Sequence, residues 1–202
     1  MIRLLVIAAV AVFLHGGAFA QMTSFCIPNV SGVRSCPCNN QQVPAASTKG
    51  CDSFLNPTTV SGVGGAELAA TGTATASAAC TLVFHVTAAH NPPSNQNWHI
   101  LWKGTSTLPA GVKNGFGVRC ISGVRRAYFG MGLGSGGLGT NNAVDFPNGV
   151  QTTDAWTASQ MPTAGTTLYY YSVYRDNQGP MNCFGKSDQF NTTNAGSIVW
   201  QP

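Results

Sequence analysis

The chain has 202 residues, of which 44% are hydrophobic, only 8% are charged and 24 are glycine, and its formal net charge is +4. Hydrophobic residues in short alternating runs argue for a packed domain of ordinary size and against disorder. Apart from Arg125 and Arg126, the basic residues are scattered. This distribution argues against a nucleic-acid-binding surface, which normally needs a clustered basic stripe.

Residues 1–20 have the organisation of a secretory signal peptide. Arg3 provides the basic start, residues 4–14 are apolar, and Ala18-Phe19-Ala20 forms a small-residue cleavage site. The apolar run is shorter than the ~20 residues that a membrane-spanning helix needs. We therefore expect cleavage after Ala20 and a mature protein without a membrane span. That protein would be secreted, periplasmic or held on the cell envelope.

Residues 21–57 form a cysteine-rich segment with many turn signals and no clear strand. The chain has seven cysteines, and an exported chain of this kind more often forms disulfides than binds zinc. The C-x-C spacing in this segment differs from that of a zinc site, and no histidine lies nearby. We therefore expect disulfides and neither a metal nor a cofactor. Four cysteines lie in the segment and three beyond it: Cys26, Cys36, Cys38, Cys51, Cys80, Cys120 and Cys183.

The four cysteines of the segment are expected to form two local bridges, and the sequence leaves their pairing open. Cys36 and Cys38 are too close to bridge each other comfortably, so each is expected to reach a different partner. The remaining pair is expected to be Cys120 and Cys183, if their strands are neighbours. Cys80, on an apolar strand face, is then the thiol that stays reduced.

Residues 58–202 are expected to form one all-β domain. Alternating side chains predict strands at 66–73, 80–87, 98–104, 166–175 and 197–200, and a short strand near 144–146. The residues around Ser122 and Gly123 predict a hairpin with arms at 116–121 and 124–129. About seven to nine short strands with frequent turns are typical of an antiparallel β-sandwich, and a closed barrel is the alternative.

The stretch from Thr166 to Asp176 has the strongest strand signal of the mature chain. It reads T-T-L-Y-Y-Y-S-V-Y-R-D, with four tyrosines and neither glycine nor proline. At a period of two, bulky side chains fall on both faces of this strand. We therefore expect it to be a central strand with both faces covered.

Six short elements of the chain also resemble an uncharacterised family of exported, cysteine-containing, β-rich bacterial proteins found in Planctomycetes and similar bacteria. The resemblance spans most of the mature chain, although each element is short. It implies an exported, cysteine-stapled β-rich module and no particular activity. The family pattern has no cysteine at the position of Cys80, which marks that residue as the thiol outside the disulfides. The elements are F-C-x-P-x-V-S-G-V (Phe25–Val33), C-P-C-N (Cys36–Asn39), G-C-D-S (Gly50–Ser53), G-x-G-V-R-C (Gly115–Cys120), Y-Y-x-x-x-Y-R-D (Tyr169–Asp176) and F-N-T-T (Phe190–Thr193).

Residues able to perform acid–base catalysis follow no recognisable motif. His85, His90 and His99 lack a metal-ligand spacing such as H-E-x-x-H, and no G-x-S-x-G nucleophile motif is present. The chain has only six acidic residues, and they are dispersed. Asp176 and Asn191 are both expected to serve turns. We therefore predict that the protein is not an enzyme, with an exported hydrolase as the third hypothesis.

The aromatic residues support one binding hypothesis. Flat aromatic side chains on a β-sandwich bind sugar rings in many carbohydrate-binding modules, whereas the simpler interpretation is that they fill the core. The sequence therefore favours a non-enzymatic module with a structural or adhesive role, with carbohydrate binding as the alternative. Its expected partners are extracellular polysaccharide or envelope proteins. The candidate aromatic residues are Trp98, Trp102, Trp156, Tyr169 and Tyr171.

Overall fold

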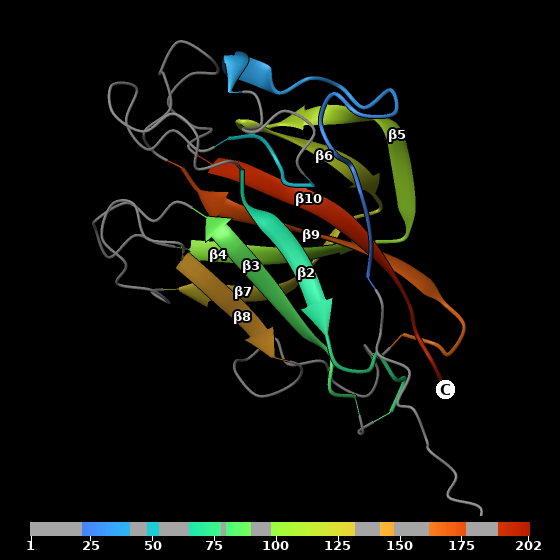
Figure 1. The fold of residues 1–202 in the computed structure, drawn as a ribbon. Coiled ribbons are helices and arrows are strands. Elements are labelled where there is room, and N and C mark those ends of the chain that lie inside the picture. The colour runs from blue at the N-terminus through green and yellow to red at the C-terminus, as the bar shows by residue number, and fades with distance from the viewer. Residues whose placement is uncertain are drawn as a thin grey trace, which may run out of the picture.

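The computed structural model describes residues 22–40, 48–52, 65–77, 80–89, 98–131, 142–147, 162–176 and 190–202. In these ranges the chain forms ten strands and one short 3-10 helix, η1 (Pro37–Asn39), and no α-helix (Figure 1). Every pair of neighbouring strands described is antiparallel. The expected all-β antiparallel fold is therefore confirmed.

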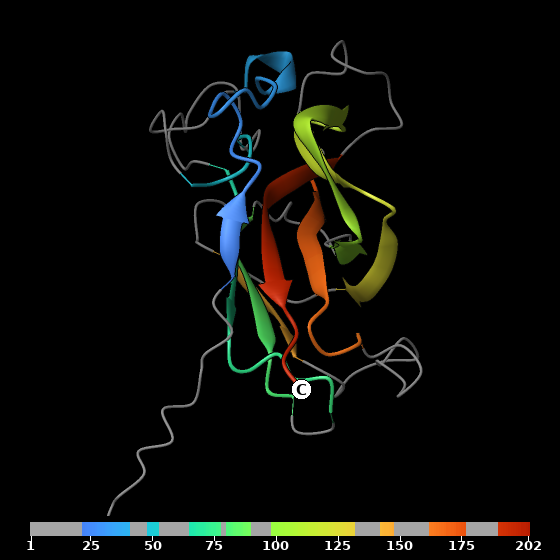
Figure 2. The same ribbon diagram turned by 90° about the vertical axis from the view of Figure 1, so that its right-hand side faces the viewer.

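The strands form three sheets. The largest has five strands in the order β1-β10-β9-β4-β7, the second has the order β2-β3-β8, and β5 pairs with β6 alone. Figure 2 shows the five-stranded sheet between the three-stranded sheet on one side and the β5–β6 hairpin on the other. The strands are β1 (Thr23–Phe25), β2 (Glu67–Thr71), β3 (Val83–Ala89), β4 (Trp98–Gly104), β5 (Ser106–Asn114), β6 (Gly117–Ser122), β7 (Arg125–Met131), β8 (Asn142–Pro147), β9 (Thr167–Arg175) and β10 (Phe190–Val199).

Strand β9 is a central strand of the largest sheet, as its sequence predicts, and it contributes to two separate cores. Leu168, Tyr170 and Tyr174 pack in the first core, between the five-stranded and three-stranded sheets. Tyr171 and Val173 point the other way, into the second core beneath the β5–β6 hairpin and the cysteine-rich segment. Because successive strand side chains alternate, one tyrosine-rich strand fills both layers.

The hairpin predicted around Ser122 and Gly123 is wrong. Strand β6 pairs with β5, whereas β7 pairs with β4, so the chain passes from one sheet to another at this point. The true hairpin turns at Gly115, whose φ of +60° suits the first central position of a two-residue turn. A glycine at the first of the two turn positions, 115 and 116, is the sequence signal for this turn. Strand β5 is not evident from the sequence because Pro109 and Gly111 weaken its strand pattern.

The last strand begins earlier than the sequence predicts. Strand β10 starts at Phe190, so Asn191 lies in a central strand and not in a turn. Its pairing with β9 is interrupted by an irregularity between Thr192 and Ala195. Four consecutive polar residues at 191–194 made this segment look like a loop, because polar runs without alternation are typical of loops.

The disulfides differ from the expected pairing. Cys26 bridges Cys120 and Cys36 bridges Cys51, so the prediction that Cys120 pairs with Cys183 is wrong. The reason is topological, since β1 and β6 both lie against β10 and this arrangement brings Cys26 to Cys120. Two bridges were expected within residues 21–57. Among the described residues, Cys36–Cys51 is the one bridge that lies within this segment. Cys80 is not part of a disulfide, as expected, and packs against the first core.

A third bridge follows from the cysteines that remain. Cys38 is also disulfide-bonded, and Cys183 lies outside the described residues. We predict that mapping of unreduced peptides finds Cys38 joined to Cys183, besides Cys26–Cys120 and Cys36–Cys51. A peptide linking Cys80 to any other cysteine would contradict this assignment.

The two described bridges should contribute unequally to stability. Their sequence separations are 94 and 15 residues. In the chain-entropy picture, replacing both cysteines of Cys26–Cys120 by alanine lowers the free energy of unfolding by about 4–5 kcal/mol, against about 3 kcal/mol for Cys36–Cys51. Denaturant unfolding of both double variants tests this order, and a larger loss for Cys36–Cys51 would contradict the entropic account.

Candidate functional site

Strand β10 carries a buried row of polar residues, Asn191, Thr192, Thr193 and Asn194, which we call the β10 polar row. Each of them is at most 1% exposed. Buried amides and hydroxyls are stable only when they are hydrogen-bonded. The partners of this row therefore determine which parts of the chain it holds together.

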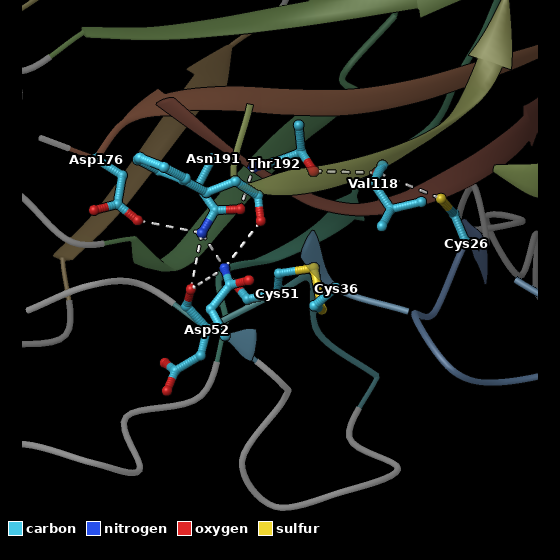
Figure 3. The surroundings of a disulfide bond; sticks show 10 residues. Cys26, Cys36, Cys51, Asp52, Val118, Asp176, Asn191 and Thr192 are labelled. Carbon is cyan, nitrogen blue, oxygen red and sulfur yellow. Dashed lines mark hydrogen bonds between the residues drawn. A yellow bond between two sulfur atoms is a disulfide. The ribbon is translucent and has the colours of Figure 1, made fainter. Parts of the chain in front are cut away.

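Asn191 binds the cysteine-rich segment. Its Nδ2 donates to the carbonyl oxygens of Cys51 at 3.3 Å and Asp52 at 3.0 Å, and to Oδ2 of Asp176 at 3.2 Å (Figure 3). Asn40 adds a second amide, whose Nδ2 donates to the carbonyls of Asp52 at 2.8 Å and Phe116 at 2.9 Å. Two side-chain amides thus fix the disulfide-bonded segment against β10 and the β5–β6 turn.

The two threonines of the row bind β6, which packs against β10, and β9, its neighbour in the sheet. Thr192 donates through Oγ1 to the Val118 carbonyl in β6, at 3.1 Å. Thr193 lies in the irregular part of β10, and its Oγ1 accepts the backbone N–H of Ser172 at 2.9 Å. A hydroxyl therefore satisfies a backbone group of β9 that the interrupted pairing would otherwise leave unbound.

Asn194 joins β10 to the three-stranded sheet. Its Oδ1 accepts the Leu68 N–H at 2.7 Å, and its Nδ2 donates to the Leu68 carbonyl at 3.2 Å and to Ser24 Oγ at 3.3 Å. The amide therefore pairs with both backbone groups of a β2 residue, as a neighbouring strand would. One side chain takes the place of strand pairing between two sheets that face each other.

Four of the six sequence elements quoted for the family resemblance meet at this row. Cys51 and Asp52, Val118, Asp176 and Asn191 come from four of them and lie in contact in Figure 3. The glycines of these elements allow the close approach, because a Cβ on Gly50 would meet the Thr192 carbonyl and one on Gly117 the Thr192 hydroxyl. The residues of these elements that Figure 3 labels therefore help to hold the fold together.

The two described histidines, His85 and His99, lie on different sheets and do not face a common site. His99 in β4 is 2% exposed and stacks on Tyr174, with ring centroids 6.1 Å apart. Burial lowers the pKa of His99 to about 4, so the ring is neutral at ordinary pH. His85 instead lies on the outer side of β3, where its Nε2 is 2.7 Å from Oγ1 of Thr71. His90 lies outside the described residues.

The candidate aromatic residues fall into two groups. Trp98 and Trp102 in β4 and Tyr169 in β9 are half-buried, and Tyr169 makes an edge-to-face contact with Phe25. Tyr171 is only 3% exposed, so its ring cannot form part of an exposed platform. Burial raises the pKa of Tyr171, while interactions with Arg119 and Asn114 oppose this shift, so the phenol stays protonated. Trp156 lies outside the described residues.

Comparisons with known proteins add no relative. No family model, curated protein or solved structure matches this chain. Within the described ranges, no three His, Cys, Asp or Glu side chains are grouped closely enough to hold a metal ion. No helix in the same part of the chain is long and apolar enough to cross a membrane. The function must therefore be inferred from the residues themselves.

Asn194→Ala should strongly destabilise the protein. It leaves the buried N–H and C=O of Leu68 without the amide that binds both, and each such group costs about 1–3 kcal/mol. We expect a loss of about 2–5 kcal/mol in the free energy of unfolding, measured by urea denaturation. Thr107→Ala, at an exposed β5 position, is the control and should change stability by less than about 0.5 kcal/mol. Equal stability of the two variants would contradict the role of Asn194.

His99 should make the protein sensitive to acid. Its pKa is about 4 in the folded state against 6.5 as the ordinary value, so the unfolded chain binds the proton first as the pH falls. The stabilisation is complete above pH 6.5 and is lost progressively towards pH 4, by about 3 kcal/mol at most. His99→Leu should flatten the dependence of unfolding free energy on pH in this window. An unchanged pH profile would show that His99 is not responsible.

Proposed function

We propose that the mature chain is an exported, non-catalytic β-sandwich module with a structural or adhesive role at or outside the cell envelope. The β10 polar row supports this proposal most directly. Its amides and hydroxyls are used to bind backbone groups of the surrounding segments, from Cys51 and Asp52 to Leu68. Side chains that could have served binding or catalysis thus hold the layers of the domain together.

The disulfides fit a module that works outside the cell. Cys26–Cys120 and Cys36–Cys51 indicate a non-reducing environment, since such bonds are rare in the cytosol. Cys26, Cys36, Cys51 and Cys120 are all buried within the second core. Export with cleavage after Ala20 is part of the proposal, which rests there on the sequence pattern of residues 1–20.

Among the described residues, the positions of His85, His99 and Asp176 support a role without catalysis. General acid–base catalysis requires a titratable group within hydrogen-bond reach of the substrate. His99 is enclosed between the sheets, and Asp176 is fully buried and receives a hydrogen bond from Asn191. His85 lies on the outer face of the smaller sheet, away from both of them.

The proposal is tested with the mature protein, residues 21–202, and isolated envelopes of the cell that exports it. We expect saturable co-sedimentation with envelopes or extracellular polymer, and an N-terminus at Gln21 when the exported protein is examined by mass spectrometry. Ester, glycoside and peptide substrates should remain unchanged. Reproducible turnover that is lost in His85→Ala or Asp52→Asn would overturn the proposal, as would cytosolic protein that retains Met1.

A further inference from the structure

We propose that the partly exposed edge of the second core along β4 binds a linear polysaccharide, with the indoles of Trp98 and Trp102 stacking on its sugar rings. This inference rests on the proposed adhesive function and names its ligand class. We call the three side chains Trp98, Ile100 and Trp102 the indole row. They alternate along β4, so they point to the same face of the five-stranded sheet.

The indole row is apolar and only partly covered. All three of its side chains are half-buried, whereas their β9 neighbours Tyr171 and Val173 are 3% and 6% exposed. Four residues along a strand separate the two indoles by about 13 Å between Cα atoms. Two aromatic rings at this separation can contact sugar rings at two points along one extended chain.

The position of the β5–β6 hairpin explains why the row is left partly open. One end of the hairpin lies on β10, where Gly117 meets Thr192. The other end meets the last residue of β4, where a Cβ on Gly104 would collide with the Ile121 side chain and the Ser122 carbonyl. Figure 2 shows the hairpin over the upper part of the sheet. It therefore buries the middle of β9 and leaves the side chains at 98–102 at its margin.

Hydrogen-bonding groups lie beside the row. Trp102 is directly opposite Tyr171, and Arg119 and Asn114 both bind the Tyr171 side chain. Arg119 and Asn114 are themselves half-buried. The accessible parts of these two side chains can therefore donate hydrogen bonds to hydroxyl oxygens of a ligand that lies on the half-buried indoles.

This combination fits a sugar chain better than a protein or a nucleic acid. A pyranose ring has apolar C–H faces and a hydroxyl-bearing edge, which match an indole face and neighbouring N–H donors respectively. A protein partner would be expected to cover a larger, more continuous apolar surface. A nucleic acid needs clustered basic residues, but only 8% of this chain is charged.

The experiment measures binding of the mature protein to soluble mixed-linkage β-glucan, xylan and galactomannan as neutral chains, and to alginate and pectin as acidic ones. Affinity electrophoresis and tryptophan fluorescence report the binding. Trp98→Ala and Trp102→Ala should each weaken it about tenfold or more, since each removes one stacking face. Trp98→Phe and Trp102→Phe keep a flat ring and should lose less than about threefold.

His85→Ala is the matched control, because His85 carries a half-buried ring on the outer face of the three-stranded sheet, away from the indole row. It should bind as the wild type does. Arg119→Gln keeps both indoles but removes the guanidinium donor, so it should weaken binding. This variant tests the site even if an alanine variant fails to fold. Thermal unfolding of each variant separates loss of fold from loss of binding.

Binding that survives Trp98→Ala combined with Trp102→Ala in a folded protein would overturn the inference. So would a wild-type protein that binds none of the five polysaccharides. If such a protein still sediments with envelopes, the adhesive function stands and only the ligand class is wrong. Binding confined to alginate and pectin, and weakened by salt, would assign the site to acidic chains through Arg119.

Discussion

The hydrogen bonds of Asn191 to Asn194 connect strand β10 to every layer of the fold. Asn191 binds the cysteine-rich segment, Thr192 binds β6, Thr193 binds β9 and Asn194 binds β2. A buried polar side chain without a partner costs several kcal/mol, whereas a fully satisfied one favours a single arrangement. The row can therefore be buried at low cost only when all four neighbours are in place, which links the assembly of both cores to one strand.

The two described disulfides restrain the same segments through covalent bonds. The carbonyl acceptors of Asn191 belong to Cys51 and Asp52, and the Cys36–Cys51 bridge restricts the segment that presents them. Cys26–Cys120 joins the chain just after β1 to β6, whose Val118 carbonyl is the acceptor for Thr192. A turn-rich segment with few strands has little apolar surface to bury, so cross-links and amide hydrogen bonds together supply the order that packing alone would not.

Much of the architecture could be predicted from alternating side chains, and the rest depends on contacts between distant segments. The tyrosine-rich strand, the two faces of β4 and the antiparallel all-β class follow from a period of two. Asn191 looked like a turn residue because a polar run reveals nothing about acceptors about 140 residues away. Likewise, alternation identifies Tyr169 and Tyr171 as neighbours on one face, but only the position of the β5–β6 hairpin shows that Tyr171 is covered.

A scaffold fixed in this way affects what its surface can bind. Trp98 and Trp102 lie on a strand flanked by β9 and β7, and the neighbouring Tyr171 is anchored by Arg119 and Asn114. Side chains on such a strand lose little freedom when a ligand arrives, so less of the interaction energy is spent on ordering the protein. A weak ligand, such as a sugar ring that gains only a few contacts, benefits most from this rigidity. The hydrogen bonds of the β10 polar row thus order the layers of the fold. The same order fixes the β4 face on which the partly exposed indoles lie.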